Sequence, residues 1–120
     1  MSKIVLWVSD LDEANHFYSA LFGVKAAEAN GDFHVVKSDV NEVFLHLLPI
    51  QFRELPSGSG SVVVREEAAI KPIFSVVNIE EARNRVKNLG AIFPSDISEY
   101  EGIQYLDCVD PEGNVIQLSN

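Results

Sequence analysis

VSDLDEA at residues 8–14 has a similar copy, VVNIEEA, at residues 76–82. Asp10 in the first copy matches Asn78 in the second, an offset of 68 residues. Each copy follows a short apolar run that is typical of a strand. Each copy also places a good helix N-cap residue three positions before a glutamate, Glu13 or Glu81, as in a capping box. An internal repeat of this kind predicts two similar modules, each with a strand that leads into a helix.

Both modules are predicted to have the order βαβββ. Gly23 and Gly90 are expected to end the two helices as C-cap glycines. The apolar stripes of the helices are Ala14, Phe17, Tyr18 and Leu21 in the first module and Ile79, Ala82, Val86 and Leu89 in the second. Strands are expected at residues 4–8, 25–29, 33–37 and 43–48, and then at 70–76, 91–97, 103–109 and 115–118.

Turn residues divide these segments. Asn30-Gly31-Asp32 is expected to make a hairpin turn in the first module, and residues 110–114, DPEGN, join the last two strands of the second. The single domain is divided into a first module at 1–50, a linker at 51–67 and a second module at 68–120. Within the linker, residues 56–61 are predicted to be a flexible loop and residues 61–67 a short extra strand.

Composition narrows the class of protein. The chain has 120 residues, 47% hydrophobic and 22% charged, which is typical of one folded globular domain. A net charge of −9 opposes binding to nucleic acid and to anionic membranes. No apolar run is long enough to span a bilayer and the start does not resemble a secretory signal, so a cytoplasmic location is expected. Cys108 is the one cysteine, and an inert, buried thiol is expected.

The repeat, the Val-x-Asp-Leu-x-x-Ala pattern before the first helix and the Asp-Pro-x-Gly-Asn-x-Ile-x-Leu motif at residues 110–118 resemble the vicinal oxygen chelate superfamily. This superfamily contains the glyoxalases, the bleomycin-resistance proteins and the extradiol dioxygenases. The resemblance implies an α+β fold in which two βαβββ modules form a half-open barrel. It also implies that the concave face holds the ligand or metal and that the protein is a homodimer.

The resemblance also implies where a metal would bind. The four ligand positions of the family correspond here to Lys3, His46, Lys71 and Gln117. A lysine ammonium has no lone pair to donate, and two of them would repel a cation. We therefore expect neither a metal site nor another cofactor. His16 and His34 are interpreted as surface or packing residues.

Strand alternation predicts which side chains share the concave face. Aromatic side chains suited to stack on a ligand are Trp7, Phe44 and Tyr105, and polar side chains that would orient it are His46, Asp107 and Gln117. Three alternatives stay open: Trp7 and Phe44 fill a closed core, Lys3 extends its ammonium into water, or Lys71 pairs with Asp107 as a structural ion pair.

Three classes of function follow. The first is a protein that binds a small molecule without a metal, by analogy with resistance proteins that sequester a cationic or aromatic drug. The second is an enzyme, a lyase or dioxygenase with a divergent site, in which either a metal is held elsewhere or the two lysines act on an anionic substrate. The third is a structural or interaction protein with a closed pocket. The sequence names no substrate and leaves open whether the protein is an enzyme.

Overall fold

The computed structural model describes residues 3–28, 31–52, 64–65 and 67–120. The first module contains β1 (Lys3–Val8), α1 (Leu11–Phe22), β2 (Phe33–Lys37) and β3 (Glu42–Leu47), followed by a 3-10 turn, η1 (Ile50–Phe52). The second contains β4 (Ile73–Ser75), α2 (Ile79–Val86), β5 (Ser98–Tyr100), β6 (Ile103–Val109) and β7 (Val115–Ser119). The fold is therefore α+β and is built from two modules of related order, as the repeat predicted.

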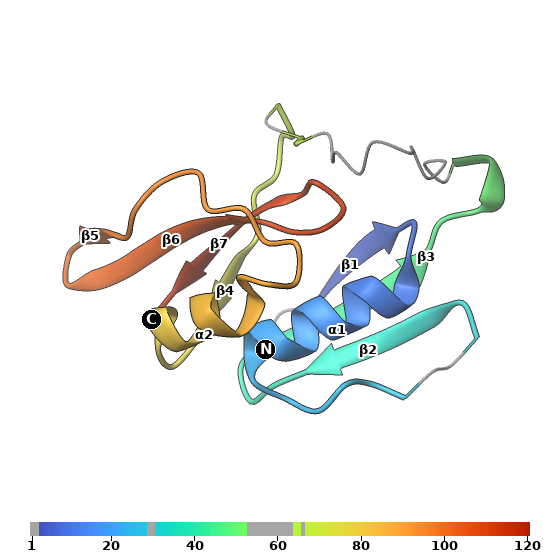
Figure 1. Ribbon diagram of the computed structural model, residues 1–120, viewed down its shortest axis with the longest axis horizontal. Coiled ribbons are helices and arrows are strands. Elements are labelled where there is room, and N and C mark those ends of the chain that lie inside the picture. The colour runs from blue at the N-terminus through green and yellow to red at the C-terminus, as the bar shows by residue number, and fades with distance from the viewer. Residues whose placement is uncertain (1–2, 29–30, 53–63, 66) are drawn as a thin grey trace.

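Each module forms its own mixed sheet. The first sheet has the order β1-β3-β2 and the second has the order β4-β7-β6-β5. In both, the strand that precedes the helix runs parallel to the last strand of the module, whereas the hairpin strands are antiparallel. Figure 1 shows the two helices next to each other in the middle of the molecule, with the two sheets extending to either side.

The helix starts follow the capping pattern. The carboxylate of Asp10 accepts a hydrogen bond from the Glu13 N–H at 3.0 Å, and the Asn78 side chain accepts from the Glu81 N–H at the same distance. Gly23 ends α1 in the left-handed conformation, with φ 67°, which a residue without a Cβ adopts at little cost. The capping residues therefore fix where each helix begins, and Gly23 fixes where the first one ends.

One hydrophobic core is shared by the sheets and helices of both modules. Buried residues of the two modules pack in a single cluster, in which the ring of Phe74 meets those of Tyr18 and Phe22 edge-on. Burial of these aliphatic and aromatic side chains stabilises each module against the other, because neither sheet could cover its helix-facing side alone.

Polar contacts also join the modules. Arg85 of α2 donates two hydrogen bonds to the last carbonyls of α1, at 2.6 and 3.0 Å. The buried hydroxyl of Tyr18 donates to Asp110 at 2.5 Å. At the open edges of the sheets, the side-chain amide of Asn41 bonds both the C=O and the N–H of Ser75, at 2.7 and 3.3 Å.

Two predicted strands are wrong. Residues 25–28 are not a strand, because the buried side chain of Asn15 bonds both the N–H and the C=O of Ala27 and holds this segment along α1. The described residues 25–28 therefore form no first strand for the hairpin expected around Gly31, and Asn30 of the expected turn lies outside the described residues. In place of a strand at 91–97, only Ile92 pairs with Val109, and Pro94 has no N–H to continue the ladder.

The end of the second helix also differs from the prediction. The helix ends at Val86 with Lys87 as its C-cap, and a further turn leads to Gly90, whose φ is 87°. Leu89 is consequently 40% exposed and does not extend the buried stripe. Most of the predicted linker at 51–67 lies outside the described residues, and its first two residues belong to η1. Of the extra strand expected at 61–67, only residues 64–65 and 67 are described, and they are not in a strand. No helix in the described ranges is long and apolar enough to cross a membrane.

Candidate functional site: the helix-free face

The predicted site residues share one face of the two sheets, which we call the helix-free face. Along β1 the residues Ile4, Leu6 and Val8 turn toward the core, while Lys3, Val5 and Trp7 are exposed. The same alternation leaves six further residues of this face exposed or half-exposed: Phe44, His46, Ile73, Tyr105, Asp107 and Gln117. The residues buried at the opposite parity are Val43, Leu45, Phe74, Leu106, Cys108, Ile116 and Leu118. The predicted facing of these strands is thus confirmed, including that of Cys108, which is buried on the helix side.

On the first sheet an aromatic group surrounds His46. The rings of Trp7 and His46 have centroids 4.4 Å apart, and the ring of Phe33 stacks on the other side at 6.4 Å. Trp7 remains 51% exposed, so it presents a flat apolar surface to solvent. Nearby, the ammonium of Lys3 lies 3.9 Å from Glu42 and 5.9 Å from the centre of the Phe44 ring.

On the second sheet Lys71, Asp107 and Gln117 form a polar cluster. The Nζ atom of Lys71 donates to both carboxylate oxygens of Asp107, at 3.2 and 3.4 Å. The Nε2 atom of Gln117 donates to the same carboxylate at 3.1 Å. The ion pair considered in the sequence analysis is thus present. Tyr105 lies on the same face of β6, but no described ring contact joins it to Trp7 or Phe44.

A cavity of about 410 Å³ adjoins this cluster and is called the second-sheet cavity. Its lining consists of Val64, Arg65, Ala68, Ile70, Lys71, Ile92, Pro94, Asp107, Val109 and Val115. Aliphatic walls with a few polar groups at one point are the usual surroundings of a bound small molecule.

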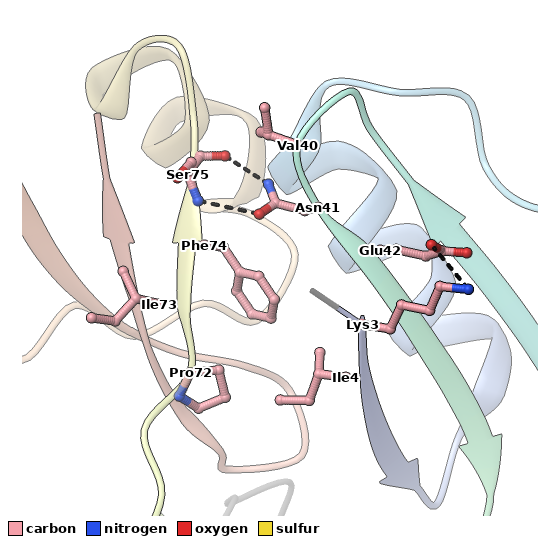
Figure 2. A pocket seen from close by; sticks show the side chains of 9 residues that line it. All are labelled: Lys3, Ile4, Val40, Asn41, Glu42, Pro72, Ile73, Phe74 and Ser75. Atoms are coloured by element: carbon pink, nitrogen blue, oxygen red, sulfur yellow. Dashed lines mark hydrogen bonds and ion pairs between the residues drawn. The ribbon is translucent and has the colours of Figure 1, made fainter. Parts of the chain in front are cut away.

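A further cavity of about 410 Å³ lies between the facing edges of β1 and β4. Figure 2 shows Ile4 from one edge and Pro72 and Phe74 from the other turning toward this space, with the Asn41 amide bridging to Ser75 beside it. The two sheets are therefore not joined by a strand ladder here. The Asn41 side chain bridges them, and the gap is lined by both apolar and polar residues.

The donor set does not fit a divalent metal. Lys3 and Lys71 offer protons, and each already lies beside a carboxylate. The strand register adds a second reason: Val5 pairs with Phe44, and its repeat equivalent Ile73 pairs with Gln117. The first-module equivalent of Gln117 is therefore Phe44, which has no donor atom, whereas His46 lies opposite Trp7, further along the strand. Among the described residues, no three His, Cys, Asp or Glu side chains are grouped to hold an ion.

The strongly perturbed titratable groups lie away from this face. Burial, and then the neighbouring Asp110 charge, raise the pKa of Tyr18 well above its ordinary value. Burial raises the pKa of Cys108 to about 12. Burial also raises the pKa values of Glu13 and Glu112. These groups surround the junction between α1 and the turn after β6, so their shifts reflect packing between the modules.

Sequence reasoning missed several residues that belong to the site. Phe33, Val109 and Val115 follow from the same alternation that selected Trp7 and Asp107, since each stands at the matching parity of its strand. Val64, Arg65 and Pro94 had no such signal, because they lie in irregular segments that only the tertiary structure brings to the cavity. His16 is exposed on α1 and His34 is buried in the core.

Comparison with solved structures agrees with this architecture. A glyoxalase/bleomycin resistance protein from Albidiferax ferrireducens is 19% identical with a TM-score of 0.68. The aligned region covers 99% of this chain and 96% of that protein. A glyoxalase/bleomycin resistance protein/dioxygenase family enzyme from Burkholderia phytofirmans is 17% identical with a TM-score of 0.69, at 99% and 96% coverage. A glyoxalase/bleomycin resistance protein/dioxygenase from Alicyclobacillus acidocaldarius is 20% identical with a TM-score of 0.64, at 99% and 89% coverage.

The chain therefore has the fold of the glyoxalase, bleomycin-resistance and dioxygenase proteins over nearly its whole length. No sequence profile of a protein family matches it. No curated protein matches it either. The fold is accordingly shared with these three proteins, although each is 20% identical or less in sequence.

Proposed function

We propose that this protein binds a small molecule on its helix-free face and does so without a metal ion. The observation that carries the proposal is the second-sheet cavity, in which aliphatic walls adjoin the hydrogen-bonded cluster of Lys71, Asp107 and Gln117. Such a site can bury an apolar body and orient it through a few polar contacts. This arrangement favours ligand binding over a structural role with a closed pocket.

The aromatic group on the first sheet supports the same proposal. Trp7 is half exposed although it stands on a strand of a protein with a complete core on the other face. A tryptophan in this position offers a large surface for stacking, and His46 beside it supplies a polar edge. A flat or aromatic ligand would use this part of the face, together with Phe44 on the neighbouring strand.

The test combines two titrations. Trp7 is the one tryptophan in the chain, so its fluorescence reports directly on the first sheet when bleomycin-like and aromatic compounds are added. Calorimetry with nickel, zinc and manganese is expected to show no tight site. Tight metal binding that disappears in His46→Ala would overturn the metal-free proposal. Compounds that leave both Trp7 fluorescence and the amide signals of the second-sheet cavity unchanged would favour the closed-pocket role.

We also propose that the protein is a homodimer. Val5, Trp7 and Ile73 are each more than half exposed on the helix-free face, and a symmetric partner is the commonest way to cover such residues. Sedimentation equilibrium is expected to give twice the 13.3 kDa chain mass. A mass of one chain at all concentrations would contradict this.

A further inference from the structure

The described residues that line the second-sheet cavity carry more positive than negative charge, whereas the whole chain is negatively charged. The chain carries a net charge of −9, yet the described residues that line the cavity include two cations, Arg65 and Lys71, and one acid, Asp107. A ligand inside the cavity meets these local groups at short range, whereas the distant charges are screened by water and salt. The local groups therefore decide which ligand charge the cavity accepts.

The negative charge of Asp107 is already paired with the Lys71 ammonium. One of its oxygens accepts hydrogen bonds from both Lys71 and Gln117, and the other accepts from Lys71. A cationic ligand would have to displace the Lys71 ammonium before it could pair with this carboxylate. The Asp107 carboxylate is therefore a weak binding group for a cationic ligand.

The Lys71 ammonium, in contrast, can donate a further hydrogen bond. An ammonium group carries three N–H donors, and the described contacts of Lys71 direct them at one carboxylate only. Its side chain is 45% exposed, so a ligand oxygen can approach without displacing Asp107. Arg65 already has an interaction of its own, and the inference depends on Lys71.

The aliphatic lining of the cavity favours a ligand whose remaining part is apolar. Four aliphatic residues line the cavity beside Lys71: Ile70, Ile92, Val109 and Val115. An acyl or other apolar chain would be removed from water against these side chains. Neither the walls nor Lys71 alone would distinguish a ligand, but together they define one with an anionic head and an apolar body.

We infer that the second-sheet cavity takes a small amphipathic carboxylate, with its head group on Lys71 and its apolar chain against the aliphatic walls. This inference rests on the proposed small-molecule function and names a class of ligand for it. It replaces the cationic ligand that the overall acidity of the sequence favoured.

Three probes of equal chain length test the inference: octanoate, octylammonium and 1-octanol. Each is titrated into ¹⁵N-labelled protein, and the amide signals of Lys71, Asp107, Val109 and Val115 are followed. Octanoate is expected to bind more tightly than the other two. Lys71→Gln should weaken octanoate binding about tenfold, which is the usual effect of losing one charge-assisted hydrogen bond. Lys71→Arg should retain it, and Lys25→Gln, which removes an exposed charge elsewhere, should leave it unchanged.

A second variant separates charge from shape. Asp107→Asn removes the acid that competes for Lys71 and should strengthen octanoate binding several-fold, while thermal unfolding checks that each variant is folded. Octanol or octylammonium binding as tightly as octanoate would overturn the inference and leave the proposed function standing. No shift with any probe, while Trp7 still responds to aromatic ligands, would overturn it in the same way. No shift together with an unresponsive Trp7 would overturn both proposals.

Discussion

Asp110 organises the turn after β6 through four hydrogen bonds. Its carboxylate accepts from the Tyr18 hydroxyl, from the backbone N–H of Glu112, and from the backbone and side chain of Asn114. The same turn places the Glu112 carboxylate where the N–H of Ser9 donates to it at 2.6 Å. The Asp-Pro-Glu-Gly-Asn sequence therefore connects the second module to the start of α1.

This junction makes stability depend on pH. Burial, and to a smaller extent the Asp110 charge, raise the pKa of Glu112 above its ordinary 4.5, although hydrogen bonds from Ser9 and Asp10 act in the opposite direction. The folded state then holds the proton more tightly than the unfolded state does. The resulting stabilisation is present below pH 4.5 and is lost as pH rises through the folded-state pKa.

Glu112→Gln keeps the acceptor oxygen for Ser9 and removes this titration. We expect the free energy of unfolding of the variant, relative to the natural chain, to increase between pH 4 and pH 7. Urea denaturation at a series of pH values measures the difference. Glu28→Gln, in an exposed segment, reports the general effect of removing one negative charge. An equal pH dependence in the two variants would contradict the assignment.

Cys108 should be chemically silent in the native protein. It is fully buried, and its pKa of about 12 leaves almost no thiolate at neutral pH. We expect iodoacetamide to modify it at least about 100-fold more slowly in the native protein than in urea-unfolded protein, because the thiol must be both exposed and ionised to react. Mass spectrometry at timed intervals measures the two rates, and similar rates would show that the core around Cys108 opens readily.

At the scale of elements, Arg85 of α2 adds two hydrogen bonds to the C-cap that Gly23 already provides for α1. The last turn of α1 contains no basic residue, and Arg85 from α2 donates to the exposed carbonyls of Ala20 and Leu21. A cation at a helix C-terminus also interacts favourably with the helix dipole. Arg85→Ala is expected to lower the free energy of unfolding by about 1–2 kcal/mol.

Arg83→Ala is the matched control on the same helix. Arg83 pairs only with the exposed Glu80 among its described partners, and such i,i+3 surface pairs contribute about 0.5 kcal/mol or less. Chemical denaturation of both variants measures the contrast. Equal losses would show that the Arg85 bonds to α1 contribute no more than an ordinary surface ion pair.

At the scale of the whole molecule, Asn41 fixes how the two sheets lie. Its amide takes the place of a neighbouring strand by bonding both the N–H and the C=O of Ser75 at the edge of β4. Asn41→Ala is expected to cost about 1–3 kcal/mol because two part-buried hydrogen bonds to the Ser75 backbone are lost. Asn41→Asp should cost at least as much, since a carboxylate cannot donate to the Ser75 carbonyl.

Hydrogen exchange at Ser75 tests this role locally. Its amide should exchange faster in Asn41→Ala than in the natural chain, while amides in the centre of β6 should change only as far as global stability does. Slow exchange at Ser75 in the variant would show that another group covers the edge of β4. The Ser75 amide also borders the cavity between the sheets, so the same spectra report whether that gap closes.

Local signals in the sequence were sufficient for the repeat, for the helix starts and for the faces of the strands. Asp10 and Asn78 cap helices through side-chain contacts that span three residues, and alternation in β1, β3 and β6 needs no distant partner. These features depend on neighbours in the chain, so they can be predicted from it. The resemblance to the glyoxalase and bleomycin-resistance proteins followed from the same local patterns and was confirmed at the level of fold.

Only the tertiary structure decided the rest. Asn15 holds Ala27 against α1 and so prevents the strand predicted at residues 25–29, and the register places Phe44, in place of His46, at the position equivalent to Gln117. The second-sheet cavity likewise combines irregular residues 64–65 with strands β6 and β7. Each of these depends on a contact between residues far apart in the chain, whose energy no local pattern encodes.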